Sequence, residues 1–183
     1  MTCEGPEAAV CAKLEAYLDR MGERVVLYRQ VRMLCFTHAN RVRPANLRID
    51  YVARIDDGPI VGIEVKAAIT EAADLGRALF QCSQYAAGVI GSATCDRIAP
   101  NLVGQPLAAV LLYTDVKGMT DYVKRHGWAA HRLYGPANVG FLFNVSRGLE
   151  MRLCGERYWT EWSGWHQGMI SKGYRSGNGT FKR

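Results

Sequence analysis

Two apolar runs separated by a turn sequence give the clearest pattern of hydrophobic and polar positions in the chain. Residues 47–55 and 60–67 are rich in Val and Ile, and Asp56-Asp57-Gly58-Pro59 lies between them. Because Asp, Gly and Pro favour turns, this pattern predicts a β-hairpin. Side chains alternate across a strand, so Glu64 and Lys66 are expected to point to one face of the second strand.

Helical spacing appears on both sides of this hairpin. Apolar residues at positions 10, 14, 18 and 21 follow Pro6 and predict a first helix over about residues 6–21, and residues 71–87 also have helical character. The other expected elements are a strand or bent pair of strands at 24–31 and 33–37, a polar loop at 41–46, a strand buried on both faces at 107–113, a short helix near 119–124 and a late hairpin of 139–145 with 150–154.

Asp50 in the first strand of the predicted hairpin and Glu64 in the second suggest metal chemistry. Charged groups on a half-buried strand are costly unless they have partners. Mg²⁺ takes carboxylate oxygens and keeps several waters, and a metal-bound water becomes a stronger nucleophile. We therefore expect Asp50 and Glu64 to hold a cation. The Val65 carbonyl can add a ligand, and Lys66 can orient the attacking water or neutralise a phosphate.

The order Asp50, thirteen intervening residues, then Glu64-x-Lys66 resembles the PD-(D/E)xK nuclease superfamily, which includes restriction endonucleases, Holliday-junction resolvases, phage exonucleases and RecB-type nucleases. The proline that often precedes the acid is absent, because Ile49 stands there. The resemblance covers about residues 5–115. It implies an α/β fold with a restriction-endonuclease-like core, in which helices flank a central mixed β-sheet in the order α-β-β-β-α-β.

Gln81 and Tyr85 lie four residues apart on the second predicted helix. They resemble the Gln-x-x-x-Tyr motif of the RecB and lambda-exonuclease branch, where the pair supports the metal site and the DNA strand. The resemblance therefore implies that both belong to the catalytic site with Asp50 and the Glu-x-Lys pair. An early acid in the first helix often completes the metal shell in these nucleases. Glu7 is our choice for that ligand, and Glu15 is its rival.

Positive charge is concentrated in the second part of the chain. The 183 residues carry a net charge of +6, and residues 1–100 contain equal numbers of basic and acidic side chains, so the whole excess lies in residues 101–183. A basic surface suits the phosphate backbone of nucleic acids. The expected nucleic-acid-binding residues are Arg41, Arg43, Arg157, Lys172 and Arg175.

We expect one domain over residues 1–175, followed by a flexible basic tail over 176–183. No apolar run reaches the length of a membrane span and no basic leader is present, so a cytoplasmic protein without membrane association is expected. The six cysteines lack Cys-x-x-Cys spacing and are expected as reduced, mostly buried thiols.

Together these features predict a Mg²⁺- or Mn²⁺-dependent nuclease acting on DNA, of the phage or mobile-element exonuclease or recombination type. Two alternatives remain open. One is a Holliday-junction resolvase-type endonuclease, because resolvases of this superfamily are similarly small and work as homo-oligomers. The other is a non-catalytic nucleic-acid-binding or protein-interaction module that keeps the fold. RNA is not excluded as a substrate, since hydrolysis of either backbone uses the same metal chemistry.

Overall fold

The computed structural model describes residues 5–20, 25–36, 42–55, 59–93, 98–114, 134, 138–145, 148–153, 175–176 and 179–180. A β-sheet of seven strands forms its centre: β1 (Val25–Phe36), β2 (Val42–Ile55), β3 (Ile60–Val65), β4 (Gly88–Ala93), β5 (Ala109–Tyr113), β6 (Val139–Val145) and β7 (Gly148–Leu153). The strands lie in the order β4-β1-β2-β3-β5-β6-β7. The sheet is mixed, because β5 runs parallel to β3 and β6, whereas the other neighbours pair antiparallel.

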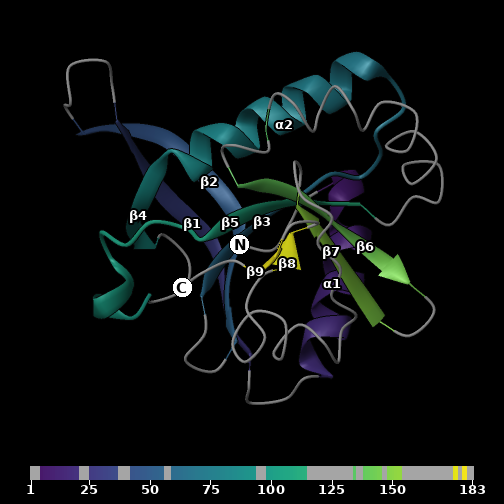
Figure 1. Ribbon diagram of the computed structural model, residues 1–183, viewed down its shortest axis with the longest axis horizontal. Helices are drawn as coiled ribbons and strands as arrows, with labels where there is room; N and C mark the ends of the chain where they lie inside the picture. Colours follow the sequence, from purple (N-terminus) through teal and green to yellow (C-terminus); the bar gives the residue numbers. More distant parts are fainter. Residues whose placement is uncertain are drawn as a thin grey trace.

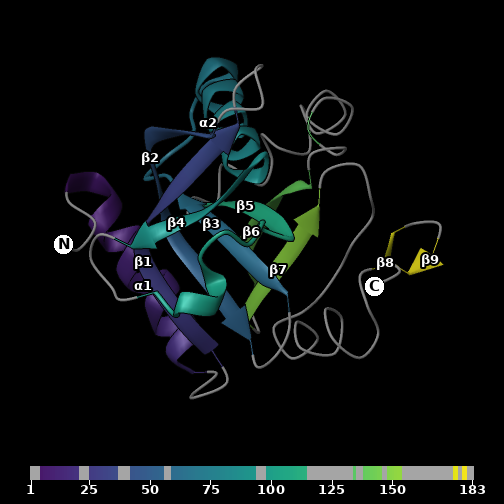
Figure 2. The same ribbon diagram turned by 90° about the vertical axis from the view of Figure 1, so that its left-hand side faces the viewer.

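Two α-helices cover opposite faces of the sheet (Figures 1 and 2). The first, α1 (Ala8–Asp19), follows the 3₁₀ turn η1 (Gly5–Glu7), and the second is α2 (Ala72–Ala86). Short elements complete the described structure: the 3₁₀ turn η3 (Pro100–Leu102) and a separate ladder of β8 (Arg175–Ser176) with β9 (Gly179–Thr180). The expectation of an α/β fold with a mixed sheet between helices is confirmed at this level.

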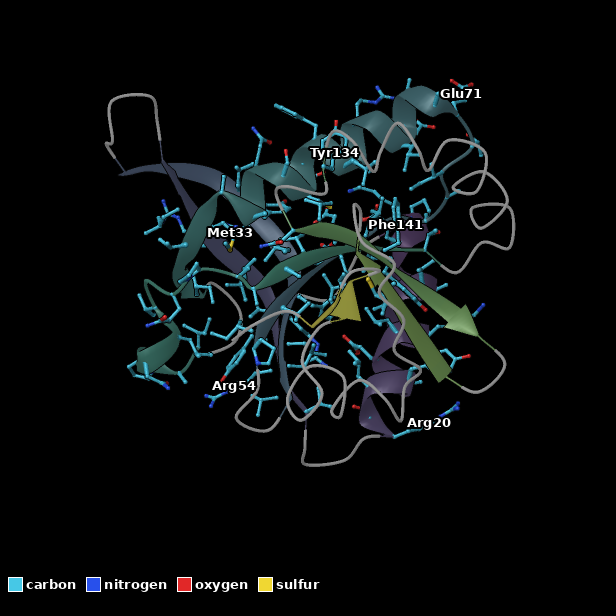
Figure 3. The ribbon with its side chains drawn as sticks, viewed as in Figure 1. Arg20, Met33, Arg54, Glu71, Tyr134 and Phe141 are labelled. Carbon is cyan, nitrogen blue, oxygen red and sulfur yellow. The ribbon has the colours of Figure 1, made fainter. Side chains whose placement is uncertain are left out.

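The hydrophobic core has two parts, one on each face of the sheet. Alternation along β5 shows the division, because Val110 and Leu112 pack on the α2 side while Leu111 and Tyr113 pack on the α1 side. Every residue of β5 is buried, as is typical of a parallel strand covered by helices on both faces. Figure 3 labels Met33 and Phe141, which both belong to the α2-side cluster.

β1 and β2 both change the face to which their side chains point at one position. Tyr51 packs on the α1 side, yet Ile49, two residues before it, packs on the α2 side. Arg29 pairs with Tyr51 and Val31 with Ile49, but the register lacks a pair between Gln30 and Asp50. Gln30 has a φ of 50°, a left-handed conformation that is uncommon for a residue other than glycine. The two strands are therefore distorted where Asp50 leaves the sheet.

Gly62 in β3 lies against the side chain of Ile49, next to this distortion. A Cβ atom at Gly62 would lie 2.5 Å from Ile49 Cδ1 and 2.7 Å from Leu107 Cδ1, which is closer than carbon atoms approach. The absence of a side chain at Gly62 therefore leaves room for the Ile49 side chain to pack against β3 on the α2 side.

Several sequence-based expectations differ from the structure. The polar loop expected at 41–46 was wrong from residue 42, because β2 begins at Val42. Strand β4, which follows α2, was not predicted. Cys11 is disulfide-bonded, so the expectation of reduced thiols was wrong there, whereas Cys82 carries a buried thiol. The helix expected near 119–124 lies outside the described residues, and the tail expected from residue 176 includes β9 and the last residue of β8.

No helix within the described ranges combines the length and the apolar character that a membrane span requires.

Candidate metal centre at the fork between β2 and β3

Asp50 lies at a fork where β2 separates from β3. The two strands pair from Arg54 with Ile60 to Tyr51 with Ile63. At the next step the Val65 backbone N–H donates a hydrogen bond of 2.8 Å to Asp50 Oδ2 instead of to a strand carbonyl. A carboxylate is thus inserted between the strands, where it takes the place of a backbone acceptor.

Glu64 and Lys66 in and after β3 lie at the same fork. Lys66 Nζ donates to Glu64 Oε1 at 2.6 Å. Glu64 is only 2 % exposed, and its other carboxylate oxygen, Oε2, is buried without a hydrogen-bond partner among the described atoms. Glu7 of η1 approaches from the α1 side, with Oε1 3.9 Å from Lys66 Nζ. Lys66 is therefore paired with carboxylates from two elements, and the charge of Asp50 also acts on it.

The electrostatics of the fork follow from this crowding. Burial, followed by the negative charge of Asp50, raises the pKa of Glu64 to about 8 even though Lys66 opposes the shift. Burial lowers the pKa of Lys66, but the carboxylates of Glu64, Glu7 and Asp50 outweigh it and leave the pKa raised. One ammonium does not fully compensate the acids, so the fork favours an additional proton or cation.

The fork contains ligands that fit a divalent cation. Within the described residues, no group of three or more His, Cys, Asp or Glu side chains is arranged to hold a metal ion. Mg²⁺, however, is commonly bound by one or two carboxylates together with several waters. Asp50 and Glu64 provide two carboxylates, and Glu64 Oε2 is a buried acceptor that lacks a partner. The chemistry of these residues thus fits a cation that keeps part of its water shell.

Gln81 and Tyr85 of α2 are brought to the fork from the α2 side. The Tyr85 hydroxyl donates to the Arg48 carbonyl at 2.7 Å, and Gln81 Nε2 donates to the Tyr85 hydroxyl at 2.7 Å. Tyr85 is fully buried, and burial followed by the charge of Glu64 raises the pKa of its hydroxyl. These hydrogen bonds fix the backbone of β2 two residues before Asp50.

Of the two acids considered in the first helix, Glu7 lies at the fork. Glu15 Oε1 instead accepts hydrogen bonds from Arg29 Nε at 2.8 Å and from the Tyr51 hydroxyl at 2.9 Å. The bond from Arg29 is the main reason that the pKa of Glu15 is lowered, against the opposing effect of burial. Glu15 therefore joins α1 to β1 and β2.

Gln30 is a site residue that the sequence analysis missed. Its Nε2 donates to Asp50 Oδ1 at 2.9 Å, while Val65 N–H binds the other oxygen of the same carboxylate. The only sequence signal is an amide among the apolar residues of β1. That signal gains meaning only when the distortion of β1 and β2 brings the Gln30 side chain to the Asp50 carboxylate.

Most of the residues expected to bind DNA lie outside the part of the chain that the structure describes. Arg41, Arg157 and Lys172 lie outside the described residues. Arg43 belongs to β2 and Arg175 to β8, but their side chains are also outside the described set.

Comparisons of this chain with protein-family models, with curated proteins and with solved structures found no match.

Proposed function

We propose that this protein is a metal-dependent DNA nuclease of the PD-(D/E)xK type, with a restriction-endonuclease-like core. The observation that carries the proposal is the meeting of Asp50, Glu64 and Lys66 at the fork, with one buried Glu64 oxygen left without a partner. The order of α1, β1, β2, β3 and α2, and the later strand β5 parallel to β3, supports it.

Each residue of the fork has a role in this proposal. Asp50 and Glu64 hold the cation, with the Val65 carbonyl as a further ligand and Glu7 as the third acid at the edge. A bound Mg²⁺ or Mn²⁺ supplies charge stabilisation to the phosphate and acidifies water. Lys66 orients the attacking water or neutralises the phosphate, because its ammonium is held beside Glu64 and is part-exposed.

Gln81 and Tyr85 act as supports of this site. Because Tyr85 is buried, its contribution passes through the Arg48 carbonyl and the backbone of β2. The Gln-x-x-x-Tyr spacing favours an exonuclease or recombination nuclease over a sequence-specific restriction enzyme.

The test is cleavage by the purified protein of linear duplex, circular duplex, single-stranded and four-way-junction DNA, with Mg²⁺, Mn²⁺ or EDTA. We expect metal-dependent cutting that Lys66→Ala slows by roughly a hundredfold or more, the contribution of a positioned proton-transfer or charge-stabilising group. Lys13→Ala on the exposed side of α1 is the matched control and should cut at the wild-type rate.

The substrate decides among the alternatives. Preference for linear ends supports an exonuclease, and preference for the junction supports a resolvase-type endonuclease. Cleavage of RNA but not DNA would replace the proposed substrate. Salt-sensitive DNA binding without any cutting would replace the nuclease by a non-catalytic module.

Gln30→Gly is expected to weaken Mn²⁺ binding by about 10- to 100-fold, the usual effect of removing a side chain that orients a metal ligand. Glycine adopts the left-handed backbone of position 30 without strain, and this offsets part of the stability that is lost with the hydrogen bond to Asp50. Calorimetric titration with Mn²⁺ measures the affinity. In an Asp50→Asn background the same change should have no further effect, and an equal loss there would show that Gln30 does not act through Asp50.

A further inference from the structure

Two arginines face each other across β1 and β2 next to the fork. Arg32 of β1 is the register partner of Arg48 of β2, so their side chains leave the sheet on the same face. Arg48 is exposed and Arg32 is partly exposed. Arg48 precedes Asp50 by two residues, which places the two Cα atoms roughly 7 Å apart along the strand. We call Arg32 and Arg48 the arginine pair.

The arginine pair lies on the α1 side of the sheet, beyond the area that α1 covers. Val31 and Met33 pack on the α2 side, and so does Ile49. Side chains alternate along a strand, so Arg32, between Val31 and Met33, and Arg48, next to Ile49, point to the α1 side. The α1-side cluster takes its β2 residues only from Tyr51 onward. Figure 1 shows the far ends of β1 and β2, at the upper left, well apart from α1.

Like charges directly opposite each other on a sheet destabilise it. Within the part of the chain that the structure describes, neither arginine of the pair has an acidic partner. Other arginines do have ring or acid partners: Arg29 binds Glu15, and Arg20 stacks on Tyr17 with 4.9 Å from Cζ to the ring centroid. The pair therefore leaves two guanidinium groups available to an anion beside the acidic fork.

The backbone of the pair is fixed relative to the candidate catalytic acid. The Tyr85 hydroxyl binds the Arg48 carbonyl, and Asp50 is bound by Gln30 and by Val65 N–H. A phosphate held by the arginines would thus keep a constant position relative to the fork. Guanidinium groups suit phosphate oxygens because they offer several N–H donors in one plane.

We propose that Arg32 and Arg48 together bind one backbone phosphate of the DNA strand, adjoining the phosphate that is cut at the fork. This inference rests on the proposed nuclease function and adds a binding site to it. The pair anchors the substrate strand, while Asp50, Glu64 and Lys66 act on the next part of that strand.

The test measures the affinity of a labelled DNA duplex against salt concentration, without divalent metal and in a Glu64→Gln background that prevents cleavage. The combined Arg32→Gln and Arg48→Gln changes should weaken binding about tenfold or more and reduce the slope of log affinity against log salt by about 1, the value for one lost phosphate contact. Arg20→Gln removes an exposed arginine at the end of α1, which Figure 3 shows well apart from Met33, the residue next to Arg32 in β1. This control should leave both quantities unchanged.

One further variant and one further measurement separate binding from folding. Arg32→Lys with Arg48→Lys should keep the salt slope, because the charge remains, while losing part of the affinity with the planar donors. Melting temperatures of the Gln variants should stay constant or rise, because a like-charge pair is removed. An unchanged slope in a well-folded double Gln variant would overturn the phosphate site while leaving the nuclease intact. If the wild-type protein neither cuts nor binds DNA, the proposed function fails as well.

Discussion

Glu64→Gln is expected to reduce the rate of DNA cleavage by about a thousandfold or more. A metal ion supplies several kcal/mol of charge stabilisation to the transition state, and each 1.4 kcal/mol corresponds to roughly a tenfold change in rate. Glutamine keeps the size of Glu64 but removes one of the two carboxylates proposed to hold the cation. The buried position of Glu64 leaves little room for water to replace the lost ligand.

The measurement is single-turnover cleavage of linear duplex with saturating Mn²⁺. Glu71→Gln is the matched control, since Glu71 is an exposed residue that precedes α2 (Figure 3) and the same chemical change should leave the rate unaltered. Where Glu64 is ionised, binding of DNA by Glu64→Gln should be equal to or tighter than wild type, because a negative charge facing the phosphate is then gone. A Glu64→Gln protein that cuts at the wild-type rate would remove Glu64 from the site.

The second large effect is a stability that falls as pH rises through the window between about 4.5 and 8. Glu64 has a pKa of about 8 in the folded chain and an ordinary value of 4.5 when exposed. Between these values the unfolded chain has lost the proton that the folded chain still holds, so the folded state becomes less favoured as pH increases. At about 1.4 kcal/mol per pH unit, the loss in the free energy of unfolding amounts to roughly 5 kcal/mol across the window.

Thermal melts in EDTA from pH 5 to pH 8.5 test this. Glu64→Gln lacks the titrating group, so its melting temperature should exceed that of wild type by a margin that grows with pH to about 10 °C, given roughly 2–4 °C per kcal/mol for a chain of this size. Mn²⁺ should remove most of the difference at high pH by stabilising the ionised wild-type site. Parallel pH profiles of the two proteins would show that Glu64 is not a buried acid with a raised pKa.

Local patterns predicted the elements around the fork well. The turn sequence at 56–59 and the apolar runs beside it predicted β3 and the part of β2 from residue 47 onward. The helical spacing of 71–87 predicted α2 to within one residue at each end. The late hairpin of β6 and β7 was also expected. In each of these cases a strong local signal agrees with the tertiary structure, and no distant segment is needed to define the element.

Tertiary pairing decided the elements that the sequence did not reveal. Pro44 and polar neighbours predicted a loop, but the segment pairs with the end of β1. The register of that pairing jumps between Met33 and Cys35, from Leu47 to Arg43, so Pro44 lies in the irregular part where its missing N–H costs least. β4 is an edge strand that is defined by its pairing with β1.

The candidate site was predictable only in part, for the same reason. Asp50, Glu64 and Lys66 could be placed on adjacent strands from their spacing alone, and the structure brings them together. Gln30 could not be recognised as a site residue from the sequence, because its role depends on a left-handed backbone and on a partner twenty residues away in sequence. Choosing between Glu7 and Glu15 required knowing which end of α1 lies at the fork.

The consecutive antiparallel arrangement of β1, β2 and β3 has a consequence for how the chain folds. These strands join residues that are close in sequence, whereas β5 must return to β3 after α2 and β4. Contacts between nearby residues form faster than contacts that close long loops. The fork is therefore expected to assemble before β5 shields it from water. The acids of the fork then come together while solvent can still screen their repulsion. Under the proposed function, a divalent cation present at that stage would accelerate folding rather than only stabilise the finished protein.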